Sequence, residues 1–528
     1  MIDFLWNQYI GKVRIDFFQS GILIIGLIIF QFPYLSLGHY WDEAWVYAPA
    51  LRAMAEGIPS IWPDAISLDL SRGHPLLFQF LGGVWCKVFG TSNASLHCFA
   101  LSISATLLIM IQFGLKKIIG LWPAFLASIA VATSPMFLAQ SAMVYPEMMM
   151  TLGLVTAMVN YVAGNKLFFS LGLALALFSK ESALVFLIGF LLLDLGRLIF
   201  DERDKGWFAV YSIPILVIIF HLGSLYVTYG WILYPNHTDY IRFDLRDVMY
   251  HIRSVFRFNF EDQGRGWIIY PILILATLSI RLKHIGFNLL IIAIGFSAYK
   301  ILIWKWVVPT YLYPPIMIVG VLAPIIVWWF TRKERVEMRP TSLYLVLTYL
   351  ISVGFVVFSA MNFFTNRYML SIVVLLITAS VIIVFVTLRF NRVIKYALGI
   401  GIVGTNLFLG IDPSKRGENN IGLFNDLQVN EGLTNWMLQN VSSDELICTD
   451  FVIDNYLTNP SSGYVTKENE YVRWFEKICR GCDSSEVIIV SPTNGCMDRI
   501  KQEINAGNQL VYTDSLGNSW VSVYRRTN

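Results

Sequence analysis

Long apolar stretches alternate with short polar segments from residue 17 to residue 411. Each stretch approaches the roughly 20 residues that an α-helix needs to cross the apolar core of a bilayer. One further stretch, 75–90, is short for a span and includes Gln79 and Lys87. The pattern predicts thirteen membrane-spanning helices, at 17–37, 96–115, 121–140, 147–163, 167–179, 183–196, 207–229, 267–280, 286–306, 311–330, 341–361, 369–388 and 394–411.

The pattern changes after residue 411, where the long apolar stretches stop. The segments that follow are short, with the character of strands at 445–449, 486–490, 510–513 and 520–524 and of helices at 471–479 and 497–504. Strands that alternate with helices are typical of an α/β fold. The sequence thus predicts a mostly α protein, with a polytopic membrane domain at 1–411 and a small C-terminal α/β soluble domain at 412–528.

The lysines and arginines between the spans indicate where 75–90 lies. If this segment does not cross and the N-terminus is cytoplasmic, the basic clusters face the cytoplasm, as the positive-inside rule requires. If it crosses, the later clusters move outside, including Lys116-Lys117 and the run 332–335. We therefore expect 75–90 to be a juxtamembrane helix on the outer surface and the tail to be extracytoplasmic. The expected location is the cell membrane, in bacteria the inner or plasma membrane.

Composition narrows the class of protein further. Charged residues make up 14% of the 528 residues, hydrophobic residues make up 56%, and the mean hydropathy is +0.59. Soluble domains carry about 25% charged residues, so an ordinary soluble enzyme and a disordered chain are excluded. The formal net charge of +3 is too small to indicate a nucleic-acid partner, whereas membrane lipids are expected partners.

The six cysteines fall into two groups. Cys86 and Cys98 lie in or near apolar helices, where cysteine is usually a small, inert core residue. The other four, all in the tail, are Cys448, Cys479, Cys482 and Cys496. We expect one or two disulfides there, because an outward-facing domain is in an oxidising environment. A redox or zinc motif at Cys479 and Cys482 stays as the alternative.

Two adjacent carboxylates, Asp42 and Glu43, begin the first long outer loop within a run of aromatic residues. Asp42 could cap a helix over 43–57 with Glu43 in its first turn. An acid at the membrane surface in an aromatic pocket is also suited to act as a general base. Glu147, after the third span, adds a carboxylate on the same predicted face.

Charged and polar residues interrupt the apolar pattern at other outer turns. Lys180 and Glu181 break an apolar stretch, where charges must pair or face a cavity, so a structural pair and a functional one both remain open. Arg367 and Tyr368 lie in a later turn, and His74 begins the juxtamembrane segment. The candidates for binding a substrate among these residues and the preceding ones are His74, Glu147, Lys180, Arg367 and Tyr368.

The second long outer loop, 230–266, is rich in arginine and histidine. Its segment 244–257 has the pattern of an amphipathic interfacial helix and includes His251. Such a helix can anchor the protein at the surface or form a basic wall for an anionic lipid headgroup. Further candidates for substrate binding follow near the outer surface at Lys300, Lys305, Tyr311 and Tyr313.

Taken in order, these motifs resemble the integral-membrane glycosyltransferases of the C superfamily, in particular family 39 with its protein O-mannosyltransferases and lipid A aminoarabinose transferases. The resemblance covers roughly residues 10–410 and implies a fold of the GT-C type. One departure is Gly73-His74-Pro75-Leu76, where the family often has Glu-Lys-Pro-Pro or His-Pro-Pro. The matching motifs are Asp42-Glu43, Gly57, His74-Pro75-Leu76, Phe89-Gly90, Tyr145-Pro146-Glu147, Ser179-Lys180-Glu181, Lys305 through Pro314 and Asn366-Arg367-Tyr368.

The resemblance implies transfer of a sugar from a polyprenyl-phosphate donor to a lipid, glycan or protein acceptor on the outer face. In such enzymes an acid at the position of Asp42 acts at the acceptor, with Glu43 beside it as the second candidate catalytic residue. Basic residues hold the lipid phosphate. A divalent metal ion is the candidate cofactor, with Asp42 and Glu147 as its candidate ligands.

Two other classes of protein fit part of the pattern. A flippase or transporter of lipid-linked sugars would place ionisable residues near the midplane and show internal repeats with broken helices. The sequence shows no repeat, and its charges gather on one predicted face. A non-catalytic membrane scaffold that displays the tail would tolerate replacement of Asp42.

The distribution of lysine and arginine makes a topological prediction. Reporter fusions after Lys117, Lys205 and Arg335 should read as cytoplasmic, and a fusion at the C-terminus should read as extracytoplasmic. A cytoplasmic C-terminus would mean that 75–90 crosses the membrane, and the outer-face placement of Asp42 would be wrong.

Overall fold

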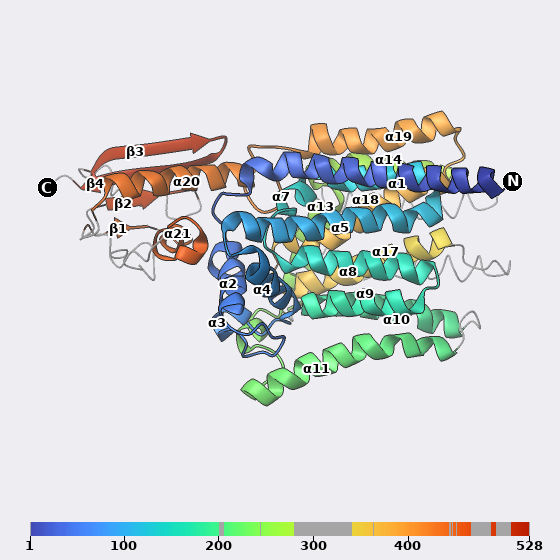
Figure 1. Cartoon of the computed structure of the whole chain (residues 1–528), viewed down its shortest axis with the longest axis horizontal. Coiled ribbons are helices and arrows are strands. Elements are labelled where there is room, and N and C mark those ends of the chain that lie inside the picture. Colours follow the sequence, from blue (N-terminus) through green and yellow to red (C-terminus); the bar gives the residue numbers. More distant parts are fainter. Residues whose placement is uncertain are drawn as a thin grey trace. The chain divides into compact units, whose positions relative to one another are not determined.

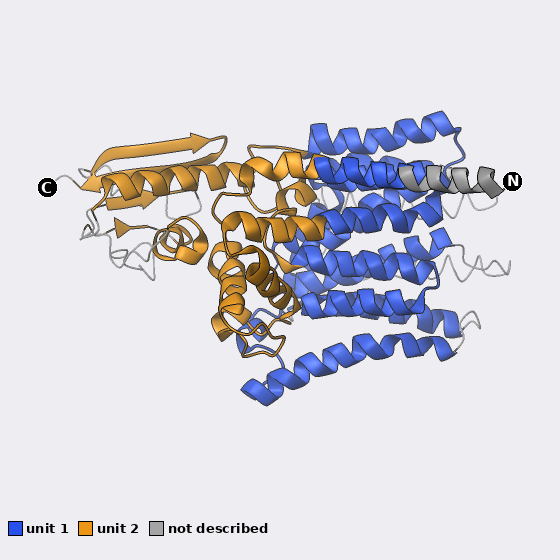
Figure 2. Ribbon diagram, viewed as in Figure 1, with its two compact units in different colours: residues 1–25, 105–134, 147–410 blue, residues 26–104, 135–146, 411–528 orange. Residues whose placement is uncertain are grey.

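The structure is a computed structural model with two compact units, shown in Figure 2. Unit 1 comprises residues 1–25, 105–134 and 147–410, and unit 2 comprises 26–104, 135–146 and 411–528. The predicted spans 286–306 and 311–330 and the predicted tail helices lie outside the described residues. The described residues are 2–199, 205–242, 244–278, 340–362, 364–442, 445, 447–449, 451–465, 487–492 and 508–526.

Unit 1 is built from helices, many of which run alongside one another (Figure 1). The helices α1 (Ile2–Gln31) and α5 (Asn93–Ile119) contribute residues to both units. The other α-helices in the described residues of unit 1 are α6 (Leu121–Ala132), α8 (Pro146–Val162), α9 (Lys166–Ser179), α10 (Leu184–Ile199), α11 (Ser212–Tyr229), α12 (Pro235–Thr238), α13 (Leu245–Phe260), α14 (Arg265–Leu278), α17 (Pro340–Met361), α18 (Leu370–Ile382) and α19 (Arg392–Thr405).

The described part of the chain contains seven helices that are long and apolar enough to cross a membrane. Large apolar side chains are exposed along two of them, such as Phe18 and Ile29 on α1 and Val227 on α11. Exposed apolar surface of this kind is expected where a helix faces lipid. The chain is therefore a mostly α, multi-pass membrane protein, as the sequence predicted. The seven helices are Ile15–Tyr34, Asn93–Ile119, Glu181–Ile199, Gly206–Tyr229, Pro340–Met361, Asn366–Thr387 and Arg392–Gly410.

The span predicted at 121–140 is interrupted. The helix α6 ends at Ala132, and a second helix, α7, covers Pro135–Gln140. Proline has no backbone N–H to donate, so it is favoured in the first turn of a helix, and Pro135 begins α7. The hydroxyl of Thr133 donates to the carbonyl of Ile129 at 2.9 Å and so competes with the backbone pattern at the break.

The helices α8 and α9 approach each other closely because glycines face the contact. A Cβ atom on Gly172 would lie 2.6 Å from the backbone nitrogen of Ala157, and one on Gly153 would lie 2.5 Å from that of Ala176. Small residues at such crossings let helix backbones pack without intervening side chains, which is common among membrane helices. This packing fixes the ends of α8 and α9, where two charged side chains of the candidate site begin.

The juxtamembrane segment predicted at 75–90 forms the helix α4 (Leu77–Phe89) in unit 2. It packs against α2 (Ala48–Glu56), and Gly82 faces the side chain of Leu51 at this contact. A short helix, α3 (Leu68–Ser71), lies between α2 and α4 in the chain. These helices support the loop that carries Asp42.

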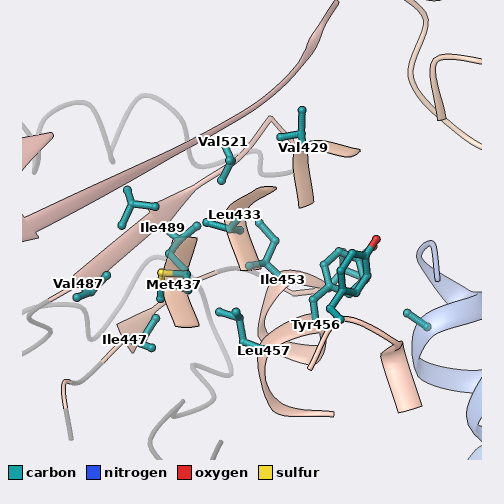
Figure 3. Packing of buried hydrophobic residues seen from close by; sticks show 14 residues of the cluster. Val429, Leu433, Met437, Ile447, Ile453, Tyr456, Leu457, Val487, Ile489 and Val521 are labelled. Atoms are coloured by element: carbon teal, nitrogen blue, oxygen red, sulfur yellow. The ribbon is translucent and has the colours of Figure 1, made fainter. Parts of the chain in front are cut away.

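The tail contains a four-stranded sheet in the order β1-β2-β4-β3, which confirms the α/β character predicted for this region. Strands β1 and β2 are parallel, and the other neighbours are antiparallel. Figure 3 shows the apolar cluster in which side chains of the sheet meet those of two tail helices. The tail elements are β1 (Ile447–Cys448), β2 (Val487–Val490), β3 (Asn508–Leu516), β4 (Ser519–Arg526), α20 (Leu423–Asn440) and α21 (Ile453–Thr458).

The cysteines follow the two predicted groups. Cys448 in the tail is disulfide-bonded, which confirms that the tail contains a disulfide. Cys86 and Cys98 are free thiols. The positions 479, 482 and 496 lie outside the described residues.

The close contact of α8 with α9 predicts that Gly172→Ala destabilises the protein. The added methyl group would meet backbone atoms that cannot rotate away, and overpacking of this kind costs about 1–3 kcal/mol. The measurement is the thermal unfolding temperature of the purified protein in detergent. Gly196→Ala is the matched control, because a Cβ atom there meets nothing within 4 Å. If Gly172→Ala unfolds at the temperature of the control or above it, the described contact is wrong.

Candidate active site

Asp42 lies in a distorted turn of unit 2. The preceding residue, Trp41, has φ 45°, a left-handed conformation that costs a non-glycine residue about 1–3 kcal/mol. A π-helix, η2 (Glu43–Tyr47), follows and leads into α2. Backbone strain and π-helical turns are both found at functional sites more often than elsewhere.

The side chain of Asp42 does not cap the helix that follows it. Its Oδ1 instead accepts a hydrogen bond from Nε1 of Trp45 at 3.0 Å. The guanidinium of Arg72 lies over the Trp45 ring, 4.2 Å from its centroid. The prediction that Asp42 caps the helix is therefore wrong. Its half-buried carboxylate is held by the indole of Trp45, and the guanidinium of Arg72 covers that indole.

Glu43 is fully buried and holds two separate segments of backbone. Its Oε2 accepts from the backbone nitrogen of Tyr40 at 3.1 Å, and its Oε1 accepts from that of Val144 at 2.8 Å. Nδ1 of His39 and Nε2 of His97 lie 3.1 and 3.3 Å from the same Oε1. Burial alone would raise the pKa of Glu43, but the two imidazoles hold that pKa below its usual range. Glu43 was predicted from the sequence to be catalytic, whereas its burial suits it to hold the loop.

Side chains of the tail brace the same loop. The hydroxyl of Tyr456 accepts from the backbone nitrogen of Trp41 at 3.2 Å. The ring of Phe451 packs edge to face against Trp41 and against Trp45, with centroids 5.7 and 5.4 Å apart. A small pocket lies here between the loop and the tail, both of which belong to unit 2. The pocket is lined by Tyr40, Trp41, Arg416, Asp426, Val429, Asn430, Val452, Ile453, Tyr456, Ser491 and Trp520.

A second cluster of charges lies in unit 1 and brings together four of the residues that the sequence singled out. Oε1 of Glu147 lies 2.6 Å from Nζ of Lys180 and 3.2 Å from Nε of Arg367. The ammonium of Lys180 also lies 3.8 Å from the centre of the Tyr368 ring. Glu147 begins α8, Lys180 follows the end of α9, and Arg367 lies in the short helix η8 (Asn366–Met369) before α18.

These charges are removed from solvent. Glu147 is 0% exposed, Arg367 2% and Lys180 5%. Oε2 of Glu147 has no hydrogen-bond partner within the described part of the chain. A buried ion pair repays its desolvation only when its geometry is good, and ionisable residues inside a membrane protein usually mark a functional site. Lys180, Glu147 and Arg367 converge in this site. Their convergence favours a functional role for Lys180 over an isolated structural pair.

The other predicted site residues are less informative. His74 is half-buried, and its backbone nitrogen donates to Ser71 at 2.9 Å. His251 lies on the amphipathic helix α13, which forms as predicted, with its ring beside Tyr250. Asp42 and Glu147 belong to different units, so a metal ion shared by them stays a prediction. Lys300, Lys305, Tyr311 and Tyr313 lie outside the described residues.

Three residues of the site were not predicted from the sequence: His39, His97 and Arg52. His39 lies before the helix that begins at Glu43, so its distance of four residues from Glu43 was no reliable signal of their contact. His97 gave no signal, because it reads as part of the apolar span 96–115. Arg52 donates to the backbone carbonyls of Thr91 and Ser461 and to the side chain of Asn93, contacts that sequence spacing does not reveal.

No family model matches the sequence, and no curated protein matches it. Two crystal structures of ArnT from Cupriavidus metallidurans align with nearly the whole chain. The structure bound to undecaprenyl phosphate has 12% sequence identity and a TM-score of 0.48, over 95% of this chain and 97% of ArnT. The apo structure has 13% identity and a TM-score of 0.42, over 98% of both chains.

The free energy of unfolding should fall in acid, and part of this fall should come from His39. Burial lowers the pKa of His39 from 6.5 to about 4, so the unfolded chain takes up this proton first as the pH falls. The contribution of neutral His39 is complete above pH 6.5 and is lost as the pH falls from 6.5 to about 4, by up to about 3 kcal/mol. The thermal unfolding temperature should fall over this range, and it should fall less for His39→Gln. Equal falls in the two proteins would contradict this account of His39.

Proposed function

We propose that this protein is a membrane glycosyltransferase that moves a sugar from a polyprenyl-phosphate donor to an acceptor at the outer face of the membrane. The main support is the cluster in which Lys180 and Arg367 are buried among apolar helices around Glu147. The leaving group of such a reaction is a lipid phosphate, whose negative charge grows as the bond to the sugar breaks. Cations fixed in a water-poor site stabilise that charge without reorganisation.

The two cations suit different parts of this task. The guanidinium of Arg367 can bind two phosphate oxygens at once, and the ammonium of Lys180 acts as a point charge. Glu147 keeps both side chains near each other before the donor arrives. We propose that the donor phosphate takes up part of the cation contacts that Glu147 makes in the free protein. Lys300, Lys305 and His251 remain candidates for further contacts with this phosphate.

Asp42 is the proposed general base. The hydroxyl oxygen of the acceptor attacks the anomeric carbon of the donor, and the bond between that carbon and the phosphate oxygen breaks. The proton of the hydroxyl passes to the Asp42 carboxylate, and the electron pair of the broken bond leaves with the polyprenyl phosphate. The hydrogen bond from Trp45 keeps the carboxylate in one orientation, which favours attack from a fixed direction. Glu43 acts by holding the loop.

Asp42→Asn should abolish most of the turnover while preserving the fold. The amide keeps the shape of the side chain and can still accept from Trp45, but it cannot take a proton. Loss of a general base lowers the rate by roughly 100-fold or more. The assay measures transfer of radiolabelled sugar from polyprenyl phosphate, with thermal unfolding recorded for each variant. A folded Asp42→Asn protein with near-normal turnover would remove Asp42 from the mechanism.

The control in this assay is Arg367→Gln, which should show a different defect. A charge-assisted contact with phosphate is worth about 1.5–3 kcal/mol, so donor binding should weaken by roughly 10- to 100-fold. Asp42→Asn should instead bind the donor normally. If both variants bound donor and turned it over like the wild type, the scaffold alternative would gain support.

A further inference from the structure

A buried cluster includes the residue next to the candidate base. It consists of His39, Glu43 and His97. Their exposed fractions are 0%, 0% and 1%. The two rings meet edge to face, with centroids 4.8 Å apart. Nδ1 of His39 and Nε2 of His97 both face Oε1 of Glu43, and neither nitrogen reaches a well-aligned hydrogen bond within the described part of the chain. Full burial of three such groups needs a physical reason.

The neighbours of the two rings determine where the ring protons lie. Nδ1 of His97 lies 2.8 Å from the carbonyl oxygen of Leu35, which can only accept, so this nitrogen carries a proton. Nε2 of His39 lies 3.4 Å from Nη2 of Arg52, which can only donate, so this nitrogen is the acceptor. The proton of His39 is therefore on Nδ1 and faces Glu43.

Nε2 of His97 lies 3.3 Å from Oε1 of Glu43. The same oxygen accepts from the backbone nitrogen of Val144, so the ring limits where the carboxylate can lie. We infer that His97 is a positioning residue, which holds the Glu43 carboxylate and acts through it on Asp42. This inference rests on the proposed function, because it gives His97 a part in the same reaction.

The connection from His97 to Asp42 is a short series of contacts. His97 contacts the Glu43 carboxylate, and Glu43 accepts from the backbone nitrogens of Tyr40 and Val144. The backbone nitrogen of Glu43 in turn donates to the carbonyl of Tyr40 at 2.9 Å. These bonds close the turn around Trp41, whose left-handed backbone is held only while both sides are fixed. If the turn relaxed, Asp42 would move away from the acceptor.

The same three side chains could be metal ligands, since their ligand atoms lie within 4.8 Å of one another. The neighbours of His39 disfavour a metal ion. The cluster contains one carboxylate, and the Arg52 guanidinium already lies beside His39. A metal bound at Nδ1 of His39 would also place the proton of that ring on Nε2, against the donors of Arg52. A dication would therefore add charge to a buried site that is already neutralised.

Two substitutions of His97 separate its two contacts. In His97→Asn the amide nitrogen can replace Nδ1 and still donate to Leu35, but the contact with Glu43 is lost. In His97→Gln the amide nitrogen can take the place of Nε2 beside Glu43, but the contact with Leu35 is lost. We expect His97→Asn to lower kcat at least tenfold with KM for the donor within twofold of wild type. His97→Gln should retain kcat within about threefold, since the contact with Glu43 is the one that positions Asp42.

The experiment uses the full-length protein in the sugar-transfer assay, with Asp42→Asn alongside. Equal losses in both His97 variants, normal kcat in His97→Asn, or a change in KM alone would overturn the inference. If Asp42→Asn is inactive while His97→Asn is normal, only the inference about His97 fails, whereas an active Asp42→Asn protein counts against the proposed function itself. The metal content of the purified protein should be the same in the wild type and in His97→Asn. One bound metal per chain that is lost in His97→Asn would overturn the positioning role of His97.

Discussion

The buried carboxylate of Glu43 is the interaction on which the candidate base depends. One side chain satisfies two backbone N–H groups from segments a hundred residues apart in the chain and faces two imidazoles. An unpaired carboxylate in such a place would be very costly, so each of these contacts supports the others. The result is a stiff turn in which a strained tryptophan and an oriented aspartate are maintained together.

The charged cluster of unit 1 is subject to the same constraint, which is that a buried charge needs a partner. Glu147, Lys180 and Arg367 are buried, yet each lies at the end or interruption of a helix and not in the middle of an apolar one. Helix ends leave backbone groups that need partners, and they also let side chains from several helices meet. The glycine contacts between α8 and α9 bring two of these ends together. The apolar helices thus position a polar cluster without any change in their own pattern.

The sequence predicted the parts of the fold that depend on local periodicity. Helices of sufficient length, the four strands of the tail and the amphipathic helix α13 were all visible as patterns of apolar residues. The interruption at Thr133 was missed although Thr133, Ser134 and Pro135 break the apolar pattern there, because long apolar runs flank them on both sides. The π-helix after Asp42 was missed because it depends on the long-range contacts of Glu43, and these contacts have no signature in sequence spacing. For the same reason the sequence could predict Glu147, Lys180 and Arg367 as separate site residues, but it could not predict their contacts with one another.

The central claim is that sugar leaves a lipid phosphate, and a donor with two labels tests it most directly. The purified protein in nanodiscs would receive a polyprenyl-phosphate sugar with one isotope in the sugar and another in the phosphate, together with membrane lipid, glycan and peptide acceptors. The account predicts that the labels separate, with one free polyprenyl phosphate released for each sugar found in an acceptor. Labels that stay together while the lipid moves from one leaflet to the other in vesicles would show a transporter and contradict the account.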